Sequence, residues 1–586
     1  MNFLVGFTLS TGLPEQNLQA ADTALVRELS HFAHLEHKTL MIGETRLVLW
    51  GHNNLSECFH FLPDGSLIAV VGSPLGEIHW PTLQNSLLQP AVEEQFEFPW
   101  DGRVILLWIS ADGKCWTMWN DWLGSLPVYH AKVESGRLAS TLELVTVAGA
   151  GYTSDDFFLP GLVSLLINGH FISDWTLYKN MKTVPPDSMT VWSDTDFQVK
   201  PLKTVQPSQD RWETSWDDLV DEMYELSRDA IAETLKTRSS WILPLSSGLD
   251  SRLIAAVGAD LGIEMYAYAW GEPKSTDVVF SHEIAKQLSI PWQRIDLPDD
   301  FLIQYTPHWA DLFGSSMHFH GMYQMAFLDA IRSSPGEAII SGFIGDVLSG
   351  SSLMQFDKGS VVYKKEWYKH WTTKETKALV KFPIDNELRE IADAVKNQIE
   401  PVKGSHFLKA LFFELWTRQR FFTSFQATLS DYWRGVATPF LNRKYARFCM
   451  SLPRIALENR RLLGDVFRRH YGRVAVIPGT YANEPFIRTG RYLIRQRIVR
   501  YLPSVLHLGP FAGFEEVPLR LDIASLQHTG RAALWPIFEN RDILSAWLDV
   551  KQLDIAYQTI MHSAEDIQPL RKLQSVQTLA YRLLNT

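Results

Sequence analysis

Hydrophobic and polar residues alternate in short runs over the first third of the chain. Such a period of two places one face of an extended segment in a core and predicts β-strands. Turn-forming sequences such as Pro63-Asp64-Gly65 separate the runs, and helical periodicity is found around 21–31 and 159–168. We therefore expect a layered α+β domain built on antiparallel sheets. Its strands are predicted at 45–50, 66–71, 103–109, 114–119, 126–133 and 189–192.

The polar segment 201–214 contains Pro201, Pro207 and Ser208 and predicts a linker. A helix is expected at 216–236, immediately after it. The sequence thus divides into two expected domains, residues 1–205 and residues 206–586.

Strand and helix patterns alternate between residues 240 and 350. This alternation indicates βαβ units, and hence a parallel sheet with helices on both faces. Ligands in such sheets bind outside the carboxyl ends of the strands. Beyond residue 350 the sequence is mostly helical. Strands are predicted at 241–245, 264–270, 292–296 and 337–341, and helices at 251–261, 276–288 and 317–332.

The first of these strands leads into a turn of small residues at 246–251, with the sequence Ser-Ser-Gly-Leu-Asp-Ser. Backbone N–H groups and the start of the next helix would face a ligand there, and Gly248 allows close approach. A carboxylate beside phosphates makes sense mainly as a Mg²⁺ ligand, which assigns that role to Asp250. The turn therefore predicts a loop that binds the pyrophosphate part of ATP.

A second acid-bearing turn, Ser-Gly-Phe-Ile-Gly-Asp at 341–346, follows the strand predicted at 337–341. Both turns lie at carboxyl ends of strands in one parallel sheet, so we expect them on the same rim. Asp250 and Asp346 together supply the carboxylates that a Mg²⁺–ATP site needs.

The two turns resemble motifs of the asparagine synthetase-like family, whose synthetase domain is a PP-loop ATP pyrophosphatase. The family's Ser-Gly-Gly-x-Asp-Ser is similar to 246–251 with one Gly replaced by Ser. Its Ser-Gly-x-Gly-x-Asp is similar to 341–346 with the second Gly displaced by one position. The segments 120–129, 139–143, 175–186, 438–442 and 451–453 also resemble the family, so the similarity covers about residues 1–480.

The resemblance implies ATP and Mg²⁺ as ligands, with Mg²⁺ held by Asp250 and Asp346. It also places Arg460 or Arg461 near a catalytic lysine of the family. An Arg there can stabilise phosphate oxygens but does not readily donate a proton. The positions implied for ATP are Leu245, Ser246, Ser247, Gly248, Leu249, Asp250, Ser251, Arg252, Ala269, Trp270, Gly271, Ser341 and Gly342.

The chain departs from the glutamine-dependent members at its start. Their N-terminal domain is a glutaminase whose nucleophile is an N-terminal cysteine, whereas position 2 is Asn2 and the nearest cysteine is Cys58. An amide cannot form the glutamyl thioester. We expect a degenerate class II glutamine amidotransferase-like domain kept as a scaffold, an α+β layered sandwich before the α/β PP-loop synthetase domain and its helical C-terminal part. β-Lactam synthetases and lasso-peptide cyclases resemble this chain in that they too lack the glutaminase cysteine.

Several side chains remain candidates for proton transfer or substrate contact. Phe343 stands where asparagine synthetases carry Glu, and it can do no acid or base work. His318 and His320 are candidate bases or substrate contacts at the start of the helix before the second turn, and their spacing would put them on different helix faces. The alternative is that each is a capping or packed histidine. Asp277 is expected to be an ordinary first-turn charge, and Arg252 to lie beside nucleotide or substrate.

Composition limits the partners of the protein. A net charge of −11 argues against a dedicated nucleic-acid binder. Three scattered cysteines fit no disulfide framework or zinc site, which favours a reducing cytoplasm. No apolar run approaches the roughly 18 residues of a membrane span.

The sequence therefore predicts an ATP-dependent, AMP-forming amide ligase that works without glutamine hydrolysis. The expected substrate is a peptide or small molecule carrying a carboxylate and an amine. The most specific expectation is closure of a macrolactam, as in lasso-peptide cyclases. That reaction would involve a precursor peptide and a partner protease. One alternative is an asparagine synthetase-type amidotransferase that uses ammonia on a small metabolite or sugar acid. Another is a non-catalytic binding subunit, against which the intact Asp250 and Asp346 argue.

Overall fold

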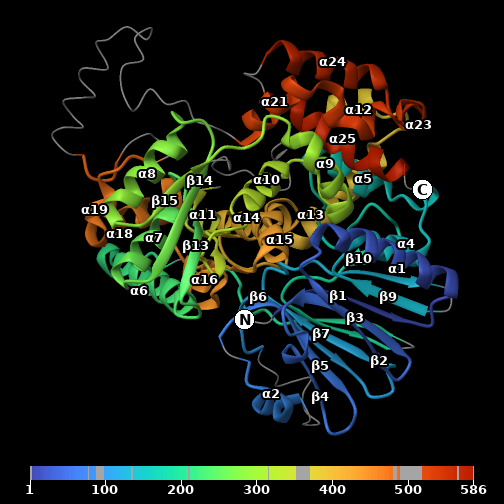
Figure 1. Cartoon of the computed structure of the whole chain (residues 1–586), viewed down its shortest axis with the longest axis horizontal. Coiled ribbons are helices and arrows are strands. Elements are labelled where there is room, and N and C mark those ends of the chain that lie inside the picture. The colour runs from blue at the N-terminus through green and yellow to red at the C-terminus, as the bar shows by residue number, and fades with distance from the viewer. Residues whose placement is uncertain are drawn as a thin grey trace.

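The computed structural model of the chain describes two adjoining regions and a helical C-terminal part (Figure 1). Asn2 lies outside the described residues. The structure describes residues 3–76, 78–87, 98–133, 136–193, 196–208, 211–314, 316–351, 370–479, 485–488, 518–563 and 567–584.

The N-terminal region contains a 12-stranded sheet with the path β10-β8-β9-β1-β5-β6-β7-β11-β12. Nearly all of its strand pairs are antiparallel, while β1 and β5 meet in parallel at Leu4 and Val71. The strands are β1 (Phe3–Thr11), β2 (Glu36–Ile42), β3 (Thr45–His52), β4 (Phe59–Phe61), β5 (Leu67–Leu75), β6 (Asp101–Ile109), β7 (Trp116–Asn120), β8 (Tyr129–Val133), β9 (Gly136–Ser140), β10 (Met181–Thr183), β11 (Ser188–Trp192) and β12 (Phe197–Pro201).

The sheet folds into two layers around an apolar core. Phe7 and Leu47 of β1 and β3 pack in one cluster with Leu107 and Met118 of β6 and β7. The outer faces are covered by helices, with α1 (Glu15–Leu29) and α4 (Glu143–Ala150) on one side and α2 (Trp80–Leu87) on the other. This arrangement confirms the predicted layered α+β sandwich.

The second region is built on a five-stranded parallel sheet of order β15-β14-β13-β16-β17. The first four strands confirm the prediction, and β14 has the predicted bounds. The fifth was not predicted, because two residues are too few to show a periodicity. The strands are β13 (Ser240–Pro244), β14 (Glu264–Trp270), β15 (Trp292–Ile295), β16 (Ala338–Ile340) and β17 (Val436–Ala437).

Helices fill most of the remaining described chain, as predicted beyond residue 350. The helix predicted at 317–332 is shorter, since α10 begins only at Met322. The short 3₁₀ segments are η1 (Ser30–Phe32), η2 (Leu55–Glu57), η3 (Ser154–Asp156), η7 (Pro439–Leu441), η8 (Glu458–Arg460) and η9 (Gly530–Leu534), and η6 (Leu415–Thr423) is a π-helix. The α-helices are α5 (Leu159–Asn168), α6 (Trp216–Leu235), α7 (Leu249–Asp260), α8 (Thr276–Leu288), α9 (Phe301–Phe313), α10 (Met322–Ala330), α11 (Gly345–Leu348), α12 (Thr373–Leu379), α13 (Asp385–Ile399), α14 (His406–Glu414), α15 (Phe425–Trp433), α16 (Arg443–Cys449), α17 (Arg454–Leu457), α18 (Arg461–His470), α19 (Gly472–Ala475), α21 (Pro518–Thr529), α22 (Trp535–Phe538), α23 (Arg541–Trp547), α24 (Val550–His562) and α25 (Gln568–Leu584).

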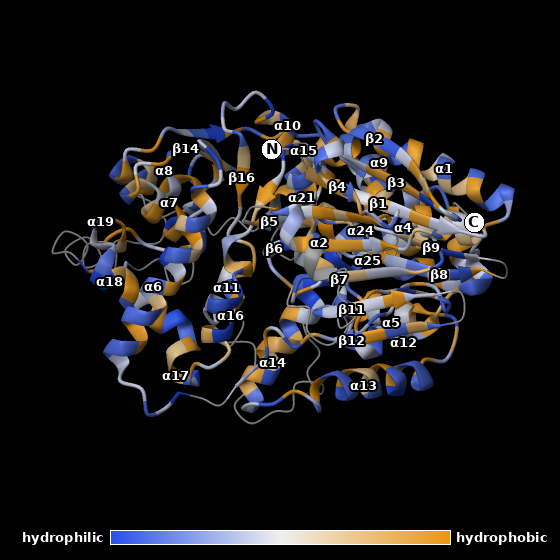
Figure 2. Ribbon diagram, turned by 90° about the horizontal axis from the view of Figure 1, so that it is seen from below, coloured by the Kyte–Doolittle hydropathy of each residue, from blue (hydrophilic) through white to orange (hydrophobic). Residues whose placement is uncertain are grey.

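The C-terminal helix α25 lies in the same half of the molecule as the N-terminal strands, away from α6, α7 and α8 (Figures 1 and 2). Its Arg582 forms a buried ion pair with Glu143 of α4. A second buried pair, Arg103 Nε to Asp431 Oδ2 at 3.2 Å, joins β6 to α15. The two regions therefore share one continuous interior.

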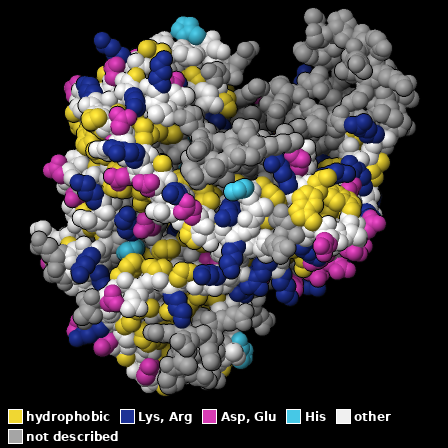
Figure 3. Space-filling view, turned by 180° about the vertical axis from the view of Figure 1, so that it is seen from behind, with side chains coloured by type: hydrophobic (Ala, Val, Ile, Leu, Met, Phe, Trp, Pro, Cys, Tyr) yellow, Lys and Arg dark blue, Asp and Glu magenta, His cyan; other side chains and the backbone are white. Residues whose placement is uncertain are grey.

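On the face of the molecule turned toward the viewer in Figure 3, basic and acidic side chains are interspersed. Within the described ranges, every helix is too short or too polar to cross a bilayer.

Candidate active site

Two loops at the carboxyl edge of the parallel sheet touch one another. The loop after β13 carries Asp250, and the loop after the neighbouring β16 carries Gly342 and Gly345. A methyl group on Gly342 would lie 2.9 Å from Cβ of Asp250, and one on Gly345 would lie 2.8 Å from its Oδ1. Both glycines are therefore needed for the contact. The two sequence motifs meet on one rim, as their strand positions predict.

The segment 246–251 is shaped by its own side chains. Ser246 N–H donates to Ser251 Oγ at 3.2 Å, and Gly248 N–H donates to Ser246 Oγ at 3.1 Å. Helix α7 begins at Leu249, and the amides of its first turn, including that of Asp250, have no carbonyl partner within the helix. With the positive end of the helix dipole, these amides are suited to hold an anion.

Asp277 fixes the loop from outside. Its Oδ1 accepts hydrogen bonds from the N–H of Ser247 at 2.9 Å and from the Oγ of Ser247 at 2.5 Å. The sequence indicated only an ordinary first-turn charge at the start of α8. The tertiary contact gives this carboxylate a second role, because it holds the loop in place.

The side chain of Arg252, predicted to lie beside nucleotide or substrate, is fully buried. Its guanidinium donates to the carbonyls of Ser247 at 2.9 Å, Val474 at 3.2 Å, Ile477 at 2.8 Å and Pro478 at 2.7 Å. Arg252 thus ties the loop to the segment after α18.

A buried arginine joins the two acid-bearing loops. Arg460 donates from Nη2 to Asp250 Oδ1 and from Nε to Ser349 Oγ, the latter at 2.8 Å. Burial raises the pKa of Asp250 to about 6, Arg460 opposes this rise, and Asp346 adds to it. Asp346 accepts a hydrogen bond from Ser351 Oγ at 3.1 Å. Ser349 was not expected in the site, because no motif marks it.

The backbone around Arg460 is in an unusual conformation. Asn459 and Arg460 both have positive φ, 56° and 54°. Such conformations cost on the order of 1–3 kcal/mol each in non-glycine residues and concentrate at functional sites. Arg461 lies elsewhere, with its guanidinium 4.9 Å from the ring centroid of Trp216. Of the two arginines predicted near the family lysine, Arg460 is the one whose guanidinium contacts Asp250.

The remaining predicted nucleotide positions lie along the same edge. Leu245 N–H donates to Tyr268 O at 2.8 Å, which sets 245–248 beside Ala269, Trp270 and Gly271. Ser341 N–H donates to Ala437 O at 2.9 Å, so it connects β16 to β17.

His318 and His320 differ from their prediction in two respects. They precede α10 rather than starting a helix, and their ring centroids lie 4.2 Å apart instead of on different faces. Both rings pack on Phe422, at 4.1 and 4.4 Å. Burial and, to a smaller extent, the charge of Arg418 lower the pKa of His320 to about 3. Burial and, to a smaller extent, His320 lower the pKa of His318 well below its usual range. Imidazoles with such low pKa values are weak bases, which argues against the predicted role as general base.

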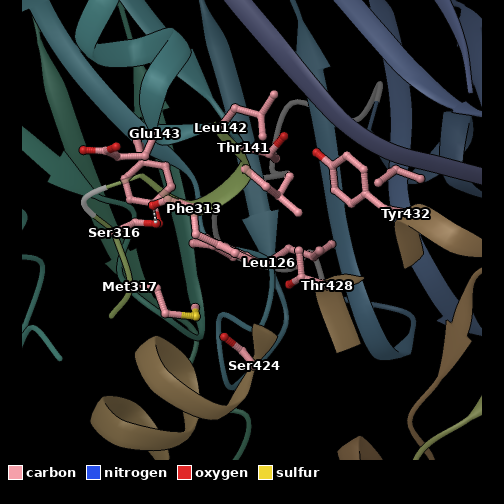
Figure 4. A pocket seen from close by; sticks show the side chains of 14 residues that line it. Leu126, Thr141, Leu142, Glu143, Phe313, Ser316, Met317, Ser424, Thr428 and Tyr432 are labelled. Carbon is pink, nitrogen blue, oxygen red and sulfur yellow. Dashed lines mark hydrogen bonds between the residues drawn. The ribbon is translucent and has the colours of Figure 1, made fainter. Parts of the chain in front are cut away.

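A small cavity lies between the two regions (Figure 4). Its volume is about 30 Å³, which is room for one or two waters but not for a nucleotide or peptide. One wall comes from the N-terminal region and includes Thr141 and Glu143, and the other comes from α9, α15 and the loop between α9 and α10. This cavity is therefore too small to be the substrate site.

The residues at this edge fit the ligands that the sequence implies. Mg²⁺ is generally held by one or two carboxylates together with phosphate oxygens, and Asp250 and Asp346 provide two. The start of α7 and the guanidinium of Arg460 are suited to phosphate. In the described ranges no cluster of three or more His, Cys, Asp or Glu residues forms a metal cage.

The fold and the rim define an α/β domain of nucleotide-binding type behind a layered β domain. The family model described as asparagine synthase matches residues 222–520, just over half of the chain. The chain belongs to the asparagine synthase family.

Two solved structures show weak likeness. The allosteric regulatory enzyme of purine biosynthesis is 10% identical, over 45% of this chain and 64% of its own, with a TM-score of 0.23. Glutamine phosphoribosylpyrophosphate amidotransferase from B. subtilis, complexed with ADP and GMP, is 9% identical, over 49% and 65%, also with a TM-score of 0.23. The chain thus spans just under two thirds of each, and such weak overlaps do not bear on the fold. Curated proteins give no match to this sequence.

Proposed function

We propose that the chain is an ATP-dependent ligase that joins a carboxylate to an amine. The carboxylate attacks the α-phosphate of ATP, pyrophosphate leaves, and an amine then displaces AMP from the acyl-adenylate to form an amide. The observation that carries the proposal is the ion pair of Arg460 with Asp250 at the start of α7, where the charge of Asp346 also acts on Asp250. Membership of the asparagine synthase family supports it.

The amides at the start of α7 and the guanidinium of Arg460 would stabilise negative charge on the phosphates and the leaving pyrophosphate. Asp250 and Asp346 would hold Mg²⁺, which supplies positive charge to the same oxygens. Arg460 remains charged throughout, so it would act as an electrostatic group rather than as a proton donor.

We propose that the amine does not come from glutamine. Asn2 cannot serve as a thiol nucleophile. Cys58 is buried, and burial raises the pKa of its thiol to about 12, which disfavours the reactive thiolate. The N-terminal region would then serve as a scaffold, in keeping with its buried ion pairs to the rest of the chain. We place the reaction in a reducing cytoplasm, which the three free cysteines support.

The specific reaction that we propose is closure of a macrolactam, with the carboxylate and the amine on one molecule. Holding both ends of one substrate raises their effective concentration and needs no second binding site for the amine. A precursor peptide and a partner protease belong to this proposal. The alternative, an amidotransferase that uses ammonia on a small metabolite or sugar acid, differs in the source of the amine.

The test is release of pyrophosphate from Mg²⁺–ATP, followed with candidate carboxylates and by mass spectrometry of AMP-linked products. We expect release by the intact chain and loss of it in Asp250→Asn, with no effect of Asp229→Asn at an exposed site on α6. Release that depends on added ammonium would favour the alternative. No release with any carboxylate, and no change in Asp250→Asn, would support a non-catalytic subunit.

A further inference from the structure

Three buried histidines surround one aromatic ring between the two regions. The ring centroid of Phe422, in η6, lies 4.1 Å from that of His318, 4.4 Å from that of His320 and 6.2 Å from that of His370. The guanidinium of Arg418 lies over the same ring at 4.9 Å. We call these five residues the histidine cluster.

The cluster holds polar atoms that the protein leaves unsatisfied. His318, His320 and His370 are 0%, 8% and 2% exposed. Both ring nitrogens of His318 and Nδ1 of His320 have no hydrogen-bond partner among the described residues. A buried polar group without a partner is unfavourable, and in native proteins such groups are commonly completed by water, an ion or a ligand.

The charges around the cluster favour an anion. Arg418, from η6, and Arg571, from α25, both act to lower the pKa of His320, after the larger effect of burial. His170, just after α5, acts in the same direction on His318 and His370. The acid that faces the cluster is Glu414, whose Oε1 lies 3.4 Å from Arg418 Nη1. A protonated amine would meet repulsion here, whereas a carboxylate would be attracted.

Glu414, which pairs with Arg418 of the cluster, also senses the charge of Asp346 in the candidate active site. Burial raises the pKa of this carboxyl, Arg418 lowers it, and the charge of Asp346 raises it again. Glu414 therefore lies within electrostatic reach of both Arg418 and Asp346. The side chain of Arg418, which contacts Glu414, is 18% exposed and is therefore partly accessible to solvent.

We propose that Arg418, His318, His320 and His370 bind an anionic group of the acceptor substrate. The acceptor would then carry two carboxylates, one activated beside Asp250 and Asp346 and the other held in the histidine cluster. This inference rests on the proposed ligase activity for the role of the site, but the binding itself does not require that activity.

Binding of an anion to neutral imidazoles is linked to proton uptake. The negative charge favours the charged form of His318, His320 and His370 and so raises the pKa of each above its value in the free protein. Arg418, Arg571 and His170 oppose this effect, and Glu414 adds to it. Affinity should therefore fall as the pH rises.

Isothermal titration calorimetry of the full chain tests the proposal, with glutarate as the dicarboxylate and butyrate as the monocarboxylate of similar length. Measurements at pH 6 and pH 8, in two buffers of different ionisation enthalpy, give the number of protons taken up without any mutation. We expect glutarate to bind with net proton uptake, at least tenfold more tightly than butyrate and more tightly at pH 6. Equal affinity for the two acids, or binding without proton uptake, would overturn the proposal.

Variants locate the site. Arg418→Gln and His320→Asn should each weaken glutarate binding at least tenfold and leave Mg²⁺–ATP binding unchanged. The matched controls are Arg389→Gln and His562→Asn at exposed positions, which should leave both affinities unchanged. Unchanged glutarate affinity in Arg418→Gln would assign the binding elsewhere and refute the site. If glutarate binds as expected but the chain releases no pyrophosphate, the ligase proposal fails and the anion site stands.

Discussion

Arg460 donates a hydrogen bond to the carboxylate of Asp250, a residue 210 positions earlier in the chain. The contact joins the loop after β13 to the strained segment before α18, and it places a permanent positive charge against the acid that would bind Mg²⁺. Arg460 is therefore positioned both to hold the two loops of the rim together and to meet phosphate oxygens.

Arg460→Met is expected to lower the rate of pyrophosphate release by about a hundredfold or more, because it removes a charge aimed at the reacting phosphates. Arg461→Met is the matched control. Its guanidinium lies over Trp216, so the rate should stay within about twofold. The measurement is initial-rate kinetics with saturating Mg²⁺–ATP, and similar losses in the two variants would contradict the assignment of Arg460.

Gly345→Ala should reduce the same rate roughly tenfold or more, since a displacement of the order of 1 Å at a catalytic site is sufficient for such losses. The new methyl group would meet Asp250 Oδ1 and the ring of Phe440, both at 2.8 Å, and would separate the two loops. Gly472→Ala, which meets nothing within 4 Å, serves as the control. Equal activity of the two variants would show that close contact between the loops is unnecessary.

Arg582→Met is expected to lower the free energy of unfolding by about 3–5 kcal/mol, because it removes the cation that pairs with the buried carboxylate of Glu143. The double variant Arg582→Met with Glu143→Leu should recover much of that loss. Lys377→Met, which breaks an exposed ion pair with Asp385, should change stability by less than about 1 kcal/mol. Urea denaturation measures all three, and a small effect of Arg582→Met alone would mean that α25 contributes little at the interface.

Stability should decline as the pH falls from about 6.5 to 4. Burial lowers the pKa of His52 from 6.5 to about 4, and the unfolded chain therefore takes up a proton that the folded chain excludes in this window. The stabilisation is present above the unfolded pKa and is lost as the pH falls toward the folded one. His52→Gln should make this decline shallower by about one proton, as measured by denaturation at a series of pH values. An unchanged slope would refute the assignment to His52.

Local sequence was sufficient for the parts of the fold that local forces determine. The bounds of β14, α5 and α8 follow from periodicity and turn residues, and the structure has them as predicted. The two acid-bearing loops could be placed on one rim because parallel strands share the direction of their carboxyl ends. The family resemblance added the ligands and the loss of the glutaminase cysteine.

Tertiary structure alone decided which side chains meet. Nothing near Arg252 in sequence indicates that its guanidinium donates to the carbonyls of Val474, Ile477 and Pro478. Which of Arg460 and Arg461 reaches Asp250 depends on the left-handed backbone of Asn459 and Arg460, an unfavourable conformation that the surrounding fold must stabilise. His318 and His320 came together because the chain before α10 is not helical. Each of these outcomes depends on packing between segments far apart in the chain, and neither periodicity nor turn chemistry carries that information.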